Sequence, residues 1–113
     1  MGLDFSHGNA HFTYSGFGRF RKRLAREIGI DLDEMDGFGG EKRWDGIQDP
    51  IVHLLNHSDC EGCLPPDVCE VVAKRLRELA SVFADEDWMK SAGMDLAKSM
   101  EEAAAQGCCL QFG

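Results

Sequence analysis

Residues 54–66 read Leu-Leu-Asn-His-Ser-Asp-Cys-Glu-Gly-Cys-Leu-Pro-Pro, and this stretch decides how the chain folds around its centre. An apolar pair ends at Leu55, and an acidic loop that contains Gly62 follows. Pro65 and Pro66 then favour a helix start, because proline suits the first turn of a helix. The stretch therefore predicts two helices joined by a tight loop that is rich in histidine, cysteine and carboxylate side chains.

The loop resembles an EF-hand loop, which has oxygen ligands at positions 1, 3 and 5, glycine at 6 and a bidentate glutamate at 12. With Gly62 at position 6, Asp59 and Glu61 fall at positions 3 and 5. The two ends do not fit, because His57 stands at position 1 and Val68 at position 12. Calcium is therefore one candidate metal, and a rigid turn that needs no ion is the favoured alternative.

Zinc is the second candidate metal. His53 and His57 are four residues apart and can share one face of a helix. Cys60 and Cys63 form a Cys-x-x-Cys pair, and two histidines with two cysteines would complete a tetrahedral zinc site. We expect no cofactor, with zinc or calcium as the alternative. The candidate metal ligands are His53, His57, Asp59, Cys60, Glu61 and Cys63.

Apolar spacing and capping residues predict the rest of the helical structure. Phe17, Phe20 and Leu24 recur on one face of a helix that Ser15 caps. Helices are expected at 17–28, at 50–57, at 66–84 and from Asp85 or Asp87 to about Gln106. The inward positions of the last two helices are expected to be Val68, Val71, Val72, Leu76, Leu79, Val82, Phe83, Trp88, Met89, Ala92, Leu96, Met100 and Ala103.

Arg75 falls within this apolar stripe, and we expect it to snorkel or to pair with an acid. Residues 31–48 are expected to form a long loop that Trp44 and Ile47 anchor to the core. Residues 3–14 predict a small hairpin around Gly8-Asn9. The tail 108–112 is expected to return as an edge strand beside that hairpin.

Length and composition place the chain among small cytoplasmic domains. Its 113 residues suit a single domain over 1–113. No apolar run is long enough to span a bilayer, and no signal peptide is visible. Five cysteines, two of them adjacent at 108 and 109, do not suit a secreted disulfide framework. We therefore expect a cytoplasmic location and no membrane contact.

Charge is distributed unevenly along the chain. Residues 1–26 hold one acid and five bases, whereas residues 27–113 hold nineteen acids and seven bases, a balance of −12. Such a surface makes duplex DNA a poor partner and suits a partner protein with a basic surface. A mobile glycine-rich loop concentrates the acids, and we expect its partner-binding residues to be Asp31, Asp33, Glu34, Asp36, Glu41 and Asp45.

The helix at 17–28 carries an opposite, basic face. Its side chains could hold phosphate groups, so an anion or nucleotide is the alternative ligand. A solvated face that pairs internally with the acid-rich remainder is the favoured interpretation of the same pattern. The candidate anion-binding residues are Arg19, Lys22, Arg23 and Arg26.

Catalytic motifs are not found in the sequence. It has no phosphate-binding loop, no G-x-S-x-G and no H-E-x-x-H. Asp4, His7 and His11 would converge if the hairpin forms, but surface histidines of this kind are common. We therefore expect a protein that is not an enzyme.

The start Met-Gly-Leu-Asp-Phe-Ser-His-Gly at 1–8 and the block at 54–62 resemble a group of small proteins of phages and prophages. The resemblance runs along most of the chain. In that group, residues similar to Thr-Pro-Glu-Glu-Cys follow the loop, with a glutamate where this chain has Val68. The resemblance implies a mobile-element origin, and the departure at Val68 puts calcium binding by this chain in doubt.

These observations predict a mainly α (α+β) fold with about four helices, an EF-hand-like helix-loop-helix and a small β element near the termini. Small acidic phage proteins often act by blocking a host protein, including defence nucleases such as those of CRISPR systems. By that analogy, we expect protein–protein binding that inhibits or modulates a host protein.

Overall fold

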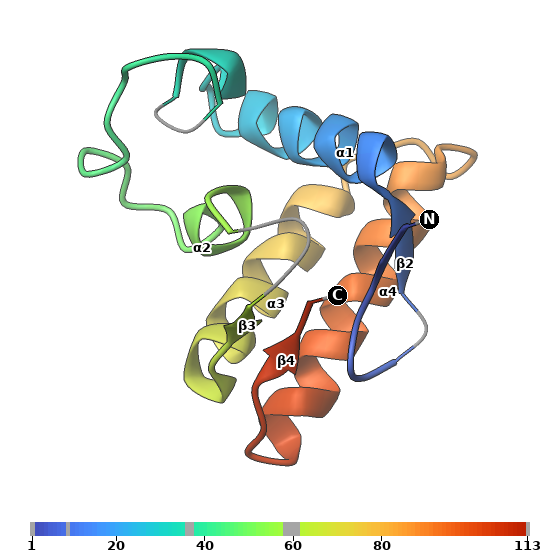
Figure 1. Ribbon diagram of the computed structural model, residues 1–113. Coiled ribbons are helices and arrows are strands. Elements are labelled where there is room, and N and C mark those ends of the chain that lie inside the picture. Colours follow the sequence, from blue (N-terminus) through green and yellow to red (C-terminus); the bar gives the residue numbers. More distant parts are fainter. Residues whose placement is uncertain (1, 9, 36–37, 58–61, 113) are drawn as a thin grey trace.

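The computed structural model describes residues 2–8, 10–35, 38–57 and 62–112, and it confirms a mainly α fold with small antiparallel strand pairs (Figure 1). In chain order the elements are β1 (Gly2–Asp4), β2 (His11–Thr13), α1 (Tyr14–Glu27), the 3-10 helix η1 (Leu32–Glu34), α2 (Val52–Leu55), β3 (Cys63–Leu64), α3 (Pro66–Ala80), α4 (Trp88–Ala105) and β4 (Leu110–Gln111).

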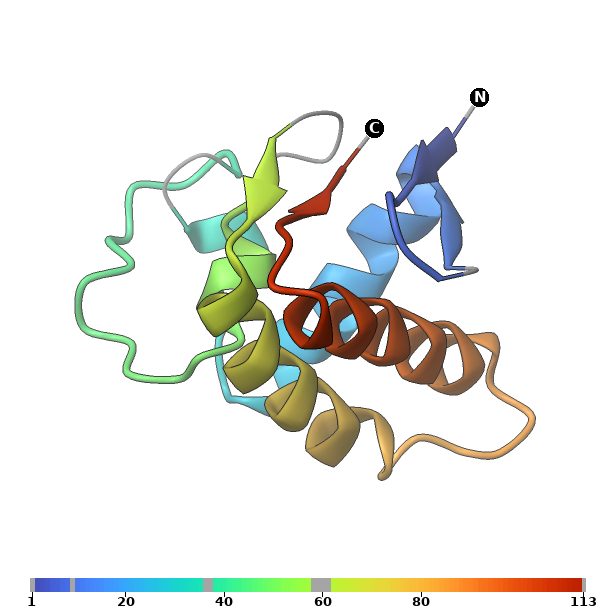
Figure 2. The same ribbon diagram turned by 90° about the horizontal axis from the view of Figure 1, so that it is seen from below.

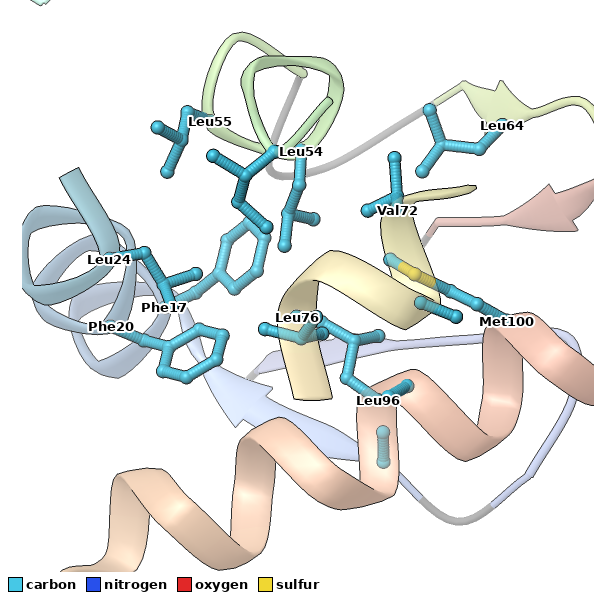
Figure 3. Packing of buried hydrophobic residues seen from close by; sticks show 14 of the residues in the cluster. Phe17, Phe20, Leu24, Leu54, Leu55, Leu64, Val72, Leu76, Leu96 and Met100 are labelled. Atoms are coloured by element: carbon cyan, nitrogen blue, oxygen red, sulfur yellow. The ribbon is translucent and has the colours of Figure 1, made fainter. Parts of the chain in front are cut away.

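The two longest helices, α3 and α4, pack side by side, and α1 crosses them (Figures 1 and 2). The close-up in Figure 3 shows Phe20 and Leu24 of α1 lying on the side of α1 that faces Leu76 of α3. Gly93 of α4 permits this close packing, because a Cβ atom there would lie 3.1 Å from the Cβ of Ala80 in α3 and 3.3 Å from Cζ of Phe20 in α1. One apolar cluster thus joins all three helices.

Helix α3 begins at Pro66, as predicted, but ends at Ala80 rather than at 84. Two residues that we assigned to its apolar stripe are exposed: Val71 is 50% exposed and Val82 is 65% exposed. Val71 lies one residue before the buried Val72, about 100° around the helix. Val82 follows the end of the helix, so the helical period no longer directs it inward.

Helix α4 begins at Trp88, and the Asp87 carboxylate caps it by accepting a hydrogen bond from the Met89 amide at 2.9 Å. The prediction that Trp88 faces inward was wrong, since its side chain is 47% exposed. Trp88 is the first residue of the helix, and its ring lies at the rim of the core, edge-on to Phe12. The inward positions from Leu96 onward are buried as predicted.

Helix α1 starts three residues earlier than expected. Thr13 is its cap instead of Ser15, and the Thr13 hydroxyl accepts a hydrogen bond from the Gly16 amide at 2.9 Å.

Helix α2 is shorter than the predicted 50–57. Its start is held by Asp49, which accepts from the Ile51 amide at 3.0 Å and also pairs with Arg75 of α3 at 2.9 Å. Arg75 therefore pairs with an acid, as expected.

The strands tie the two chain ends to the helical body. β1 and β2 form the predicted hairpin, with Leu3 opposite Phe12. The tail pairs with β3, and next to this pair the Phe112 amide donates to the Gly62 carbonyl at 2.9 Å. The tail also lies beside the hairpin, as predicted, through the bridge of Phe5 to Phe112 and the hydrogen bonds between Ser6 and Gln111.

The segment 31–48, which we call the arched loop, contains η1 and arches away from the helices between η1 and α2 (Figure 1). Trp44 and Ile47 are partly buried against the core, which confirms their predicted anchoring role. Phe38 packs edge-on against Trp44, with ring centroids 6.0 Å apart. Within the part of the chain that the structure describes, no helix is both long and apolar enough to cross a membrane.

Candidate functional site

The turn before α3 keeps the backbone of an EF-hand loop in one respect. Gly62, at position 6 of that numbering, has φ +93°, a left-handed conformation that favours glycine. Cys63 then stands at position 7, whose backbone carbonyl is a calcium ligand in an EF-hand. Here that carbonyl accepts a hydrogen bond from Nε2 of His57 at 3.3 Å. The imidazole also packs on Phe112, with ring centroids 4.0 Å apart.

The rest of the predicted metal site is not assembled by the described residues. Val68 packs against the core where an EF-hand has its bidentate glutamate. His53 is exposed on α2. Among the residues that the structure describes, no three histidine, cysteine or acidic side chains come together as metal ligands would. Asp59, Cys60 and Glu61, which complete the predicted ligand sets, lie outside the described residues.

The cysteines near β3 and β4 have distinct environments. Cys69 is buried on α3, and burial raises the pKa of its thiol, which donates to the Leu64 carbonyl at 3.4 Å. A hydrogen bond with the Cys63 thiol raises the pKa of Cys109. Raised pKa values keep both thiols protonated at neutral pH, which disfavours a role as nucleophile.

Arg21 is a site residue that the sequence analysis did not single out. Its side chain is only 5% exposed. Nη1 donates hydrogen bonds to two backbone carbonyls at the end of α2, that of Leu55 at 3.1 Å and that of His57 at 2.5 Å. The guanidinium lies 4.6 Å from the ring centroid of Phe17 and 5.1 Å from that of Phe38. One cation thus connects α1 with α2 and with the arched loop.

The four predicted anion-binding residues of α1 are brought together. Arg19, Lys22, Arg23 and Arg26 line one cavity of about 240 Å³, with Met89 of α4 on its other side. Two of the four cations are engaged: Lys22 pairs with Asp33 at 3.1 Å, and Arg23 pairs with Glu27 at 3.1 Å and with Asp87 at 3.7 Å.

The other two cations of the cavity, Arg19 and Arg26, form no ion pair with any residue that the structure describes. Both are exposed. The cavity therefore holds two guanidinium groups that are available to an anion, and guanidinium groups bind phosphate and carboxylate in a bidentate manner.

The predicted acidic residues spread along the arched loop rather than converging. Asp31 caps η1 by accepting from the Asp33 amide at 3.0 Å, and Asp45 lies 3.9 Å from Arg43. Glu34 and Glu41 are exposed and form no ion pair within the described ranges. Asp36 lies outside the described residues. Asp31 and Asp33 line one cavity together with Lys22 and Arg26, and the other described acids of the loop are exposed.

The cluster at the hairpin is brought together only in part. Nδ1 of His11 and the Asp4 carboxylate are 2.6 Å apart across the strands. His7 instead contacts the Ser6 hydroxyl at 2.8 Å and Gln106 at 3.1 Å. The three groups therefore do not share one site.

The His57 imidazole gives the first prediction. His57→Ala removes the hydrogen bond to the Cys63 carbonyl and the packing on Phe112, and should lower the free energy of unfolding by about 1–2 kcal/mol in urea titration. The control His53→Ala, at an exposed position of α2, should change the free energy of unfolding by less than about 0.5 kcal/mol.

Thermal melting of the wild-type protein tests the metal hypothesis. The wild-type Tm should be equal in calcium, in zinc and in chelator, because the imidazole already engages the carbonyl that would face the ion. A Tm that rises with the concentration of either metal would contradict this account and would return the loop to a metal-binding role.

Comparison with protein families, with curated proteins and with solved structures finds no match to this chain.

Proposed function

We propose that this chain acts as a binding protein without catalytic activity, and that its arched acidic loop at 31–48 docks on a basic surface of another protein. The observation that carries the proposal is the exposure of Glu34, Glu41 and Asp45 along a loop that is anchored to the core. Inhibition of a host protein, in the way small phage proteins act, is the form of this function that we favour.

Anchoring supports the proposal because it reduces the entropy that the loop loses on binding. Phe38 packs against Trp44, and the Arg21 guanidinium lies against Phe38. The backbone of Met35 bridges to Lys42 across the loop. The acidic side chains are thus displayed from a backbone that is partly fixed before a partner arrives.

Charge supports the same proposal. The chain has a net charge of −8, and residues 27–113 carry a balance of −12. Complementary charge accelerates association with a basic protein surface, including a groove that normally holds nucleic acid. Duplex DNA itself would be repelled by the same surface.

A charge-reversal variant tests the loop. The triple variant Glu34→Lys, Glu41→Lys, Asp45→Lys should lose the partner that wild-type protein captures from host lysate, and its affinity for the purified partner should fall about tenfold or more by titration calorimetry. Wild-type affinity should decrease with added salt, because the contact is between exposed charges.

The matched control is Glu70→Lys, Glu86→Lys, Asp95→Lys, which changes the net charge equally at exposed positions outside the loop. This control should retain the partner. Equal loss of binding in both triple variants would mean that net charge, and not the loop, governs association. Retention of the partner by the loop variant would refute the proposed docking surface.

A second candidate function is anion binding by the basic face of α1. The specific observation is that all four predicted cations line one cavity, in which Arg19 and Arg26 are available. Internal pairing, which we favoured for this face, accounts only for Lys22 and Arg23. The cavity is small, which suits a phosphate or diphosphate group.

Pyrophosphate is the probe for this site. Arg19→Ala, Arg26→Ala together should weaken pyrophosphate binding about tenfold or more in calorimetry, since hydrogen bonds to charged groups contribute roughly 1.5–3 kcal/mol. The control Lys74→Ala, Lys98→Ala removes the same charge from exposed positions on α3 and α4 and should leave binding unchanged. Equal weakening by both pairs would indicate nonspecific attraction.

A further inference from the structure

The cationic cavity on α1 continues into a second cavity that contains an aromatic ring. This neighbouring cavity, of about 290 Å³, is lined by His11, Phe12, Thr13, Gly16, Arg19 and Trp88. Arg19 lines both cavities. We call the combined feature, from Trp88 to Arg26, the α1 groove.

Trp88 is placed to stack on a flat ligand. Its side chain is 47% exposed, although the indole is held edge-on by Phe12 with ring centroids 6.5 Å apart. Gly16 borders the same cavity, where a Cβ atom would lie 3.7 Å from Cη2 of the indole and 2.7 Å from the capping Thr13 hydroxyl. Aromatic side chains beside a positively charged groove are the usual platform for nucleobases.

The cations follow the ring in order along one helix. Gly16 and Arg26 are separated by ten residues, which is about 15 Å at the helical rise. Arg19 lies where the two cavities meet, and Lys22 and Arg26 lie farther along. Arg23 is held by Glu27 and Asp87 and stacks on Phe83 at 4.4 Å, so it forms a wall of the groove.

Carboxylates limit the groove at both ends. Beyond Lys22 and Arg26, an adjoining cavity includes Asp31 and Asp33. At the Trp88 end, Asp4 is bound to His11. A long nucleic-acid strand would extend past both ends onto these acids, whereas a ligand with one base and a short phosphate chain can be held between them by Arg19 and Arg26.

We propose that the α1 groove binds a nucleoside diphosphate or triphosphate, with the base on Trp88 and the phosphate groups on Arg19, Lys22 and Arg26. The inference rests on the second candidate function, anion binding by α1, and adds the identity of the ligand class. It is independent of the acidic-loop proposal.

Titration calorimetry with ADP, pyrophosphate and adenosine, without added divalent metal, tests the groove. ADP should bind about tenfold or more tightly than pyrophosphate, because stacking on an aromatic ring contributes about 1–3 kcal/mol. Trp88→Leu should abolish this difference and leave pyrophosphate binding unchanged. Arg19→Ala should weaken both ligands, and Lys98→Ala, which removes one exposed cation elsewhere, should weaken neither.

Fluorescence provides an independent measurement. The chain has two tryptophans, so ADP should quench the emission of the Trp44→Phe variant, in which only Trp88 remains. Leucine keeps an apolar contact for Phe12, and an unchanged melting curve of Trp88→Leu would show that the variant folds.

The outcomes separate nucleotide binding from simple anion binding by the α1 groove. Equal binding of ADP and pyrophosphate, unaffected by Trp88→Leu, would overturn the nucleotide inference and leave the anion site. Binding of neither ligand would overturn both. Binding of a short oligodeoxythymidine much more tightly than ADP would also overturn the inference, because it would identify a surface for a nucleic-acid strand.

Discussion

The buried guanidinium of Arg21 is the contact on which the arrangement of the molecule depends. It is inserted from α1 between the rings of Phe17 and Phe38 and donates to the carbonyls of Leu55 and His57. Leu55 is the last residue of α2 and His57 follows its cap, and the last carbonyls of a helix have no partner within the helix. A buried cation is costly unless it is hydrogen-bonded, and here the unsatisfied end of a helix supplies the acceptors.

Both candidate surfaces follow from the inward position of Arg21. Because this side chain occupies the core side of α1, the other four cations of the helix face outward and form the α1 groove. Phe38, on which the guanidinium lies, also contacts Trp44 and so fixes the acidic loop. The basic and acidic surfaces of this chain are therefore positioned by one contact, although they would bind different partners.

Periodicity and capping predicted the helices, because burial of an amphipathic face depends mainly on local spacing. Contacts between distant segments, such as the pairing of β4 with β3, could not be predicted in this way. The exposure of Val82 and Trp88 was also not predicted, because these residues lie at helix ends. Arg21 was missed because it belongs to a run of basic residues. A usable signal existed, since Phe17, Arg21, Leu24 and Ile28 share one helical face.

The most direct test of this account is the free energy of unfolding of Arg21→Met, measured in urea beside the exposed control Arg19→Met. Methionine fills a similar space but leaves the Leu55 and His57 carbonyls without their donor. The account predicts a loss of about 2–4 kcal/mol for Arg21→Met, with faster amide exchange in α2 and around Phe38, and a change below about 0.5 kcal/mol for the control. Equal stability of the two variants would contradict the central role of Arg21.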